Sequence, residues 1–161
     1  MDAALVLTLL HVLIAMVFIA GLLGRWALLS RAAGAEEIEA AHLLTEASGP
    51  FERMVTIASM LVLPAGLLAA WARGYPFIGL GTSWVLLATI LYLTLVPLVP
   101  LVFLPRGKLF DAEMRAARQA GSVTAGLRAA FNDRRTSMAR TYELSVVLII
   151  VALMVLKPDL W

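Results

Sequence analysis

Hydrophobic residues occur in four long blocks separated by charged segments, and this pattern dominates the chain. A helix needs about 20 mainly apolar residues to cross a bilayer. The blocks therefore predict membrane-spanning helices at about 3–29, 51–72, 82–104 and 138–156. A membrane β-barrel would instead show short segments of alternating polarity. The predicted fold is an all-α membrane protein, a four-transmembrane-helix bundle that forms a single membrane domain over residues 1–161.

Prolines interrupt two of the predicted spans. Each proline removes a backbone hydrogen-bond donor and disfavours the preceding helical turn. The third span should therefore kink or unwind at Pro97 and Pro100, and Pro105 should end it. Pro64 should bend the second span.

Short amphipathic helices are predicted in the two long charged loops, about 30–50 and 105–137. Residues 35–47 fit one such helix, and the second span should then start with Pro50 at its first position. We expect these helices to lie on anionic lipid at the membrane surface.

The second loop predicts two further short helices within residues 111–135, separated at Gly121-Ser122. Asp111 and Thr124 are the expected N-caps of these two helices, because their short oxygen-bearing side chains can accept from free backbone amides.

Basic residues predict the orientation. Of the 13 lysines and arginines, eleven lie in or beside the two long loops, whereas Arg73 and Lys157 lie on the opposite side. Because cytoplasmic loops carry an excess of Lys and Arg, both long loops should be cytoplasmic and both termini outside. The four tryptophans fall at predicted span ends: Trp26, Trp71, Trp84 and Trp161.

Composition excludes several kinds of chemistry. The chain is 61% hydrophobic and 15% charged, and it has no cysteine. Disulfides, thiolate metal sites, c-type haem attachment and cysteine nucleophiles are therefore excluded. We find no Ser-His-Asp set, no paired carboxylates within a span, no phosphate-binding loop and no acidic metal cluster. We therefore predict no catalytic residues and no metal ligands, and the sequence has no nucleic-acid-binding module.

His11 is the one ionisable residue deep within a predicted span. At about 1.5 Å per helical residue, it lies roughly 12 Å below the outer end of the first span. Thr89 and Tyr92 reach a similar depth, and Pro64 leaves the carbonyl of Met60 without its usual amide donor. We expect a neutral His11 that bonds one of these groups, because intramembrane polar residues pair with other polar groups.

The alternative role for His11 is haem ligation. The other histidine, His42, lies in a predicted cytoplasmic loop on the far side from His11, so we do not expect bis-histidine ligation within one chain. Methionine could supply the second ligand, from Met16, Met60 or Met154. No cofactor is predicted on the first interpretation, and haem b at His11 is the alternative.

Small residues predict close helix packing at Gly21, Gly24 and Gly66. Glu143 lies about one turn inside the fourth span, where we expect an interfacial ion pair with Arg140.

Three stretches resemble a known family: "LLHVLIAMVFIAGLLGRW", "PRGKLFDAEMRAARQAGSVTAGLRAAFND" and "LMVLKP". They are similar to a bacterial family of predicted four-span integral membrane proteins (domain of unknown function 2269 type). The resemblance covers nearly the whole chain. It implies the fold and a multi-pass location in the bacterial inner membrane, and it implies no established activity.

A fainter resemblance connects the chain to the four-helix protoporphyrinogen oxidases and the copper-resistance membrane domains. The matching features are His11 in the first span and Lys157-Pro158 near the end. The oxidases also use a lysine in the third span, and here Lys108 lies beyond the cytoplasmic end of that span.

These observations predict a non-catalytic accessory or scaffold subunit in a membrane assembly. Its expected partners are the lipid bilayer and other membrane subunits or further copies of the chain, and not nucleic acid. The alternatives are a haem- or porphyrin-binding redox protein centred on His11 and a small ion or metal transporter.

Overall fold

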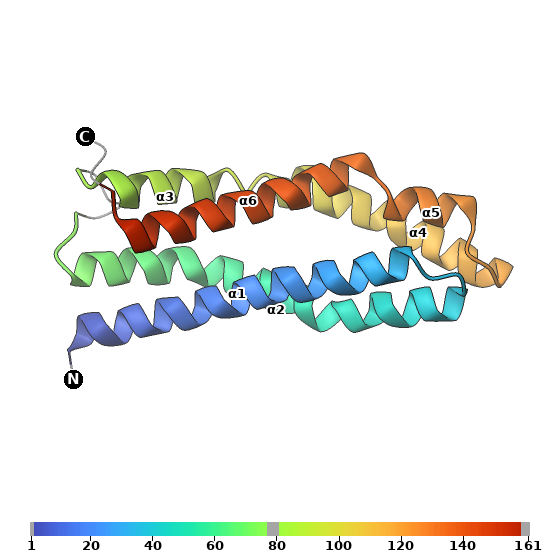
Figure 1. The fold of residues 1–161 in the computed structure, drawn as a ribbon, viewed down its shortest axis with the longest axis horizontal. Helices are drawn as coiled ribbons and strands as arrows, with labels where there is room; N and C mark the ends of the chain where they lie inside the picture. The colour runs from blue at the N-terminus through green and yellow to red at the C-terminus, as the bar shows by residue number, and fades with distance from the viewer. Residues whose placement is uncertain (1, 77–80, 159–161) are drawn as a thin grey trace.

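The computed structural model describes residues 2–76 and 81–158, and these segments are helical with no strand. Two antiparallel pairs of helices lie side by side along the molecule (Figure 1). The first pair is α1 (Ala3–Ala33) and α2 (Ile38–Ala72), and the second is α3 (Ser83–Leu93) and α6 (Arg134–Leu156). We call the end where α1 begins and α6 ends the terminal end, and the opposite end the loop end.

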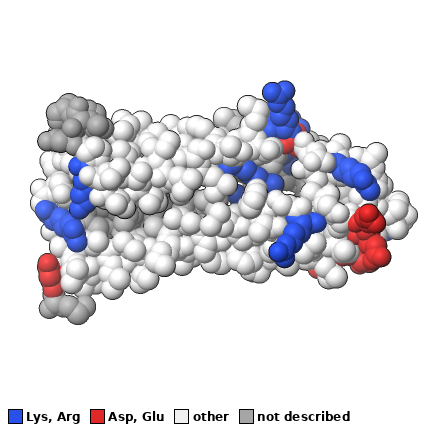
Figure 2. Space-filling model, in the orientation of Figure 1, with Lys and Arg blue, Asp and Glu red and all other residues white. Residues whose placement is uncertain are grey.

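Three helical stretches are long and apolar enough to cross a membrane. They are α1, α2 and Ala125–Leu156, which contains α5 and α6. Charged side chains on the face drawn in Figure 2 lie mainly toward the two ends, with a largely uncharged band between them. Many large apolar side chains face outward, such as Leu9 and Leu148, as expected for a surface in contact with lipid.

The predicted third span is not one continuous helix. After α3 ends at Leu93, the chain forms turns at residues 94–97 and then a π-helical segment, η2 (Val99–Phe103). The unwinding predicted at Pro97 and Pro100 is confirmed, because neither proline can donate to a preceding carbonyl. The prediction that Pro105 ends the helix is wrong. It lies in the first turn of α4 (Leu104–Ala120), where a missing N–H costs little.

The helix boundary predicted near Pro50 is also wrong. Residues 38–72 form one helix with both Pro50 and Pro64 inside it. Tertiary packing accounts for this continuity, because Ile38 is buried in a small apolar cluster at the loop end. Its other buried members come from α4 and from α5 (Ala125–Phe131): Met114, Ala117 and Leu127.

The helix caps were predicted with mixed success. Asp111 lies inside α4 and caps nothing, since that helix already begins at Leu104. Thr124 caps α5 as predicted, accepting from the amide of Leu127 at 3.1 Å. Gly121 ends α4 with φ +65°, a conformation that glycine adopts without strain.

The three described tryptophans have different surroundings. Trp26 and Trp71 are exposed on the outside of the first pair. Trp84 begins α3 and packs edge-on against Tyr75, with ring centroids 5.5 Å apart. Trp161 lies outside the described residues.

Candidate functional site

His11 is buried between the two helices of the first pair. Its Nδ1 lies 3.1 Å from the backbone carbonyl oxygen of Val62. The ring packs over Gly66, one turn further along α2, and a Cβ at that glycine would lie only 2.8 Å from His11 Cε1. Gly66 therefore leaves the space through which the imidazole reaches the α2 backbone.

The partner of His11 differs from those expected. Met60 is strongly exposed, and Pro64 lies on the same outward face of α2 one turn away. Val62 and Gly66 are also one turn apart, but they face α1. Matching residues by their depth in the membrane therefore identified the correct level of α2 but the wrong face of that helix.

Thr89 and Tyr92 lie beside the same cavity as His11, but their hydroxyls donate elsewhere. Thr89 bonds the carbonyl of Val85 in its own helix at 2.8 Å. Tyr92 donates to the carbonyl of Ser59, which joins α3 to α2.

A cavity of about 240 Å³ lies between the two pairs beside His11. Helices α1, α2, α3 and α6 all contribute to its walls, which are mostly apolar. An apolar cavity of about 150 Å³ is large enough for benzene. This cavity can therefore take a somewhat larger apolar group. Its main wall residues are Val12, Leu63, Leu67, Ala88, Ile150 and Met154.

The terminal end of the cavity is polar. Arg73, the residue after α2, donates from Nε to the Thr8 hydroxyl at 3.0 Å. Lys157, the residue after α6, holds its Nζ 5.8 Å from the centroid of the Trp84 ring. Two cations and an aromatic ring therefore lie at one end of an apolar chamber.

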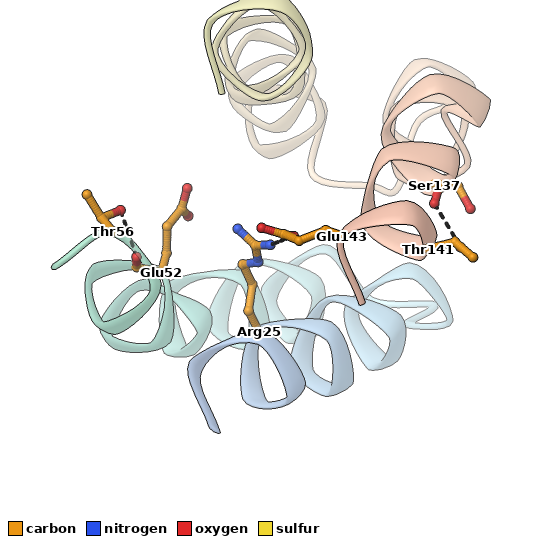
Figure 3. Close-up of polar contacts among 6 residues, drawn as sticks. All are labelled: Arg25, Glu52, Thr56, Ser137, Thr141 and Glu143. Atoms are coloured by element: carbon orange, nitrogen blue, oxygen red, sulfur yellow. Dashed lines mark hydrogen bonds and ion pairs between the residues drawn. The ribbon is translucent and has the colours of Figure 1, made fainter. Parts of the chain in front are cut away.

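A second polar group is buried toward the loop end. Arg25 of α1 donates to Glu143 of α6 at 2.9 Å, and both side chains are about 90% buried, with exposures of 11% and 10%. Figure 3 shows Arg25 and Glu143 pointing toward one another across the gap between the pairs. Glu52 of α2 lies on the other side of Arg25 in this view.

The ion pair predicted between Glu143 and Arg140 is replaced by the pair with Arg25. Arg140 lies close enough to interact electrostatically with both members, but no carboxylate of the described residues lies within ion-pair distance of it. The guanidinium of Arg25 also lies over the Phe103 ring, 5.5 Å from its centroid. One arginine thus contacts both α6 and the segment after α3.

A family model described as "Predicted integral membrane protein (DUF2269)" matches residues 5–158. The chain belongs to this family. It is therefore a predicted integral membrane protein, and the family description names no activity. No curated protein and no solved structure gives a match.

The predicted packing glycines of this family member lie where α1 meets α2. A Cβ at Gly21 would lie 2.9 Å from Val55 Cγ2 and 3.0 Å from the carbonyl oxygen of Phe51. A Cβ at Gly24 would overlap the Phe51 ring. The two helices therefore approach closely enough to exclude side chains at these positions.

The described residues contain no cluster of three or more His, Cys, Asp or Glu side chains that could hold a metal ion. His42 lies 3.3 Å from Glu46, one turn along the same helix.

Sequence reasoning missed Arg25 and the two cavity cations. A signal for Arg25 was present, because His11, Phe18 and Arg25 recur every seven residues and so lie on one face of a helix. Phe18 and His11 are buried in the structure, which identifies that face as the inner one. Arg73 and Lys157 were treated only as markers of orientation, although both follow the last turns of helices that line the cavity.

Proposed function

We propose that the chain crosses the membrane four times, with the third crossing made by α3 and the unwound segment up to Phe103. Trp84 at the start of α3 contacts Tyr75 beyond the end of α2, whereas α4 and α5 pack against the start of α2. The segment between them thus runs back along α2. Its 21 residues span about 30 Å at helical rise, which is the thickness of a bilayer's hydrocarbon core.

The proposed orientation places the loop end in the cytoplasm and the terminal end outside the inner membrane, because basic residues concentrate at the loop end. The chain has no cysteine, so single cysteines can be introduced without background. In intact cells, an impermeant maleimide should label Asp2→Cys. It should label Glu46→Cys and Gln119→Cys only after permeabilisation. Labelling of Gln119→Cys in intact cells would contradict the third crossing.

We further propose that the protein binds an apolar or amphipathic small molecule in the cavity beside His11. The single observation that supports this function is a chamber of about 240 Å³ walled by both helical pairs, with a few polar groups among apolar ones. Ligand sites in proteins have this composition, and those in helical bundles lie between the helices. The two pairs also meet at a buried apolar cluster that includes Phe18, Val55 and Val146 and at the Arg25–Glu143 contact, and a ligand in the cavity would touch both pairs.

Tryptophan quenching tests this function directly. Trp84 lines the cavity, so a variant that retains Trp84 as its one tryptophan should be quenched saturably by brominated dodecanol in phosphatidylcholine nanodiscs. Ala88→Leu narrows the cavity and should weaken binding. Leu148→Phe, on the outward surface, is the control and should not. Quenching that never saturates would mean that the alcohol reaches Trp84 only from bulk lipid, and would contradict a binding site.

Haem binding at His11 is the second candidate. If Nδ1–H donates to the Val62 carbonyl, Nε2 keeps its lone pair, the arrangement typical of ligating histidines. Of the three candidate methionines, Met154 shares the cavity with His11, whereas Met16 and Met60 are exposed. However, 240 Å³ lies below the roughly 300–1,000 Å³ of sites for drug-sized ligands, so a whole porphyrin does not fit between the helices as they stand.

The visible spectrum separates these two functions. After growth with added haem, haem binding predicts a Soret band that disappears in His11→Ala and shifts in Met154→Leu. A colourless protein that still binds dodecanol would exclude haem and retain the first proposal.

The accessory role predicted from the sequence is compatible with ligand binding, and we retain it as part of the proposal. Large apolar side chains cover the outward faces of α1, α2 and α6, and lipid or a partner membrane protein can cover these faces. Purification in mild detergent, followed by mass spectrometry of co-purifying chains, tests it. A monomer without partners under conditions that preserve ligand binding would contradict the accessory role alone.

A further inference from the structure

The residues that line the cavity beside His11 differ in polarity between its two ends. Its cations lie at the terminal end, with Arg73 following α2 and Lys157 following α6. Ile150 lines the cavity seven residues, or about 10 Å, further inside α6. On α3, Tyr92 lies eight residues, or about 12 Å, inside Trp84. The chamber therefore changes from charged to apolar along the axis of the bundle.

Arg73 and Lys157 are exposed at the terminal end of the cavity, whereas the buried Arg25 and the half-buried Arg106 have carboxylate partners. Arg25 is paired with Glu143, and Arg106 lies 3.3 Å from Asp133. Neither Arg73 nor Lys157 has a carboxylate at ion-pair distance within residues 2–76 and 81–158. The Thr8 hydroxyl holds only the Nε of Arg73. Within residues 2–76 and 81–158, the terminal nitrogens of that guanidinium have no hydrogen-bond partner and can donate to an anion.

Helix dipoles do not cancel this positive charge. The positive ends of α1 and α3 and the negative ends of α2 and α6 all lie at the terminal end, so their partial charges offset one another. The nearby described carboxylate is Asp2, which accepts from the amide of Ala4 at 3.0 Å as the cap of α1. Two cations against one carboxylate leave this end of the described chain positive.

We propose that the cavity takes an anionic amphiphile, with its carboxylate or phosphate between Arg73 and Lys157 and its apolar chain directed toward Ile150. This inference rests on the proposed binding function and specifies its ligand class. Charge complementarity carries it, since guanidinium and ammonium groups form their strongest hydrogen bonds with such oxygens. The volume suits a single chain or a ring and not a whole two-chain lipid, of which one acyl chain could enter.

The test compares probes that differ only in the head group. Brominated dodecanoate, dodecyl phosphate, dodecanol and dodecyltrimethylammonium are titrated against the single-tryptophan protein in phosphatidylcholine nanodiscs. Each anion should bind about tenfold or more tightly than the alcohol, because hydrogen bonds to charged groups are worth about one decade or more in affinity. The preferred anion identifies the source, since phosphate indicates a lipid headgroup and carboxylate a free fatty acid.

The variants assign this preference to residues. The double variant Arg73→Gln with Lys157→Gln should lose the tenfold preference and still bind dodecanol as before, which also shows that it is folded. Arg53→Gln, an exposed arginine toward the loop end, is the matched control and should retain the preference.

Three results distinguish the proposals. Equal binding of all four probes, unchanged in the double variant, would leave the binding function standing and overturn the anionic ligand. Tighter binding of the ammonium probe would also overturn it. Absence of saturable binding by any probe would contradict the binding function itself and this inference with it.

Discussion

The two polar groups buried between the helical pairs lie on one face of α1 and are held in opposite ways. His11, toward the terminal end, hydrogen-bonds a backbone carbonyl and borders a cavity of about 240 Å³. Arg25, four turns further along, is paired with a carboxylate and covered by an aromatic ring. The bundle therefore contains a cavity at the level of His11 and a buried ion pair at the level of Arg25.

This difference indicates which part of the bundle can respond to a ligand. Separating the partners of a buried ion pair strongly destabilises a folded protein, because each charge is then buried without a partner. The Arg25–Glu143 contact should therefore keep the two pairs of helices together. A single interhelical hydrogen bond in a membrane protein contributes only about 0.6–2 kcal/mol. The region around His11 can therefore rearrange at a cost that ligand binding can offset.

The largest effect is expected from Glu143→Leu, which removes the carboxylate and leaves Arg25 buried beside Arg140. Breaking a buried pair in this way costs about 3–5 kcal/mol. SDS titration in mixed micelles should show this loss in the free energy of unfolding. The double variant Arg25→Leu with Glu143→Leu should recover most of it, because no unpaired charge then remains at that position. Equal stability of the single variant and the wild type would mean that water already solvates the pair.

The next effect in size is expected at Gly21, which lies on α1 between the two polar levels. Its added Cβ in Gly21→Ala would press on the Phe51 carbonyl and the Val55 side chain, so α1 and α2 must separate. Overpacking of this kind costs about 1–3 kcal/mol. Gly107→Ala is the control, because Gly107 lies within α4 and a Cβ there meets nothing within 4 Å. It should be neutral or stabilise the helix by up to about 1 kcal/mol. Equal effects of the two substitutions would contradict the close approach.

The features that the sequence predicted correctly are those that depend on neighbouring residues in the chain. Long apolar blocks predicted the helices because length and hydropathy depend on local composition. Pro97 and Pro100 predicted the unwound segment because a missing amide acts wherever the neighbours lie. Pro50 failed as a boundary because Ile38 packs against α4 and α5, which are distant in sequence.

The site was harder to predict than the fold, because partners on different helices depend on which faces meet. Helical rise placed His11 at the right level of α2, but rise alone cannot tell Met60 from Val62. Glu143 was assigned to Arg140, its neighbour on the same helix, and pairs instead with Arg25, 118 residues away. The cavity beside His11 is formed by four helices together, so the sequence of a single helix does not predict it.

A smaller effect is expected from His11→Phe, which keeps a ring over Gly66 and removes the bond to the Val62 carbonyl. The free energy of unfolding should fall by about 1 kcal/mol, well below the effect of Glu143→Leu. The same SDS titration measures both. A loss as large as that of Glu143→Leu would show that the His11 hydrogen bond stabilises the bundle as much as the ion pair does, and the proposed difference between the two levels would then be wrong.

The smallest effects are expected from two tyrosines that bond across helices at different exposures. The Tyr92 hydroxyl donates to the Ser59 carbonyl beside the cavity, whereas the Tyr142 hydroxyl donates to Thr94 Oγ1 at 2.7 Å on an exposed surface. Tyr92→Phe should cost about 0.6 kcal/mol, and Tyr142→Phe should cost less. The buried carbonyl loses an interhelical partner, whereas the Thr94 hydroxyl still donates to the Leu91 carbonyl of its own helix.

The same pair of variants also tests how far the cavity depends on its wall. Tyr92→Phe should change dodecanol affinity at Trp84, because Tyr92 lines the chamber, and Tyr142→Phe should leave it unchanged. If the two variants instead matched in both stability and affinity, the level around His11 would be no more adaptable than the rest of the bundle. If only Tyr92→Phe alters affinity while costing little stability, the cavity wall moves independently of the contact that closes the loop end. A ligand could then reshape one level of the bundle without breaking the other.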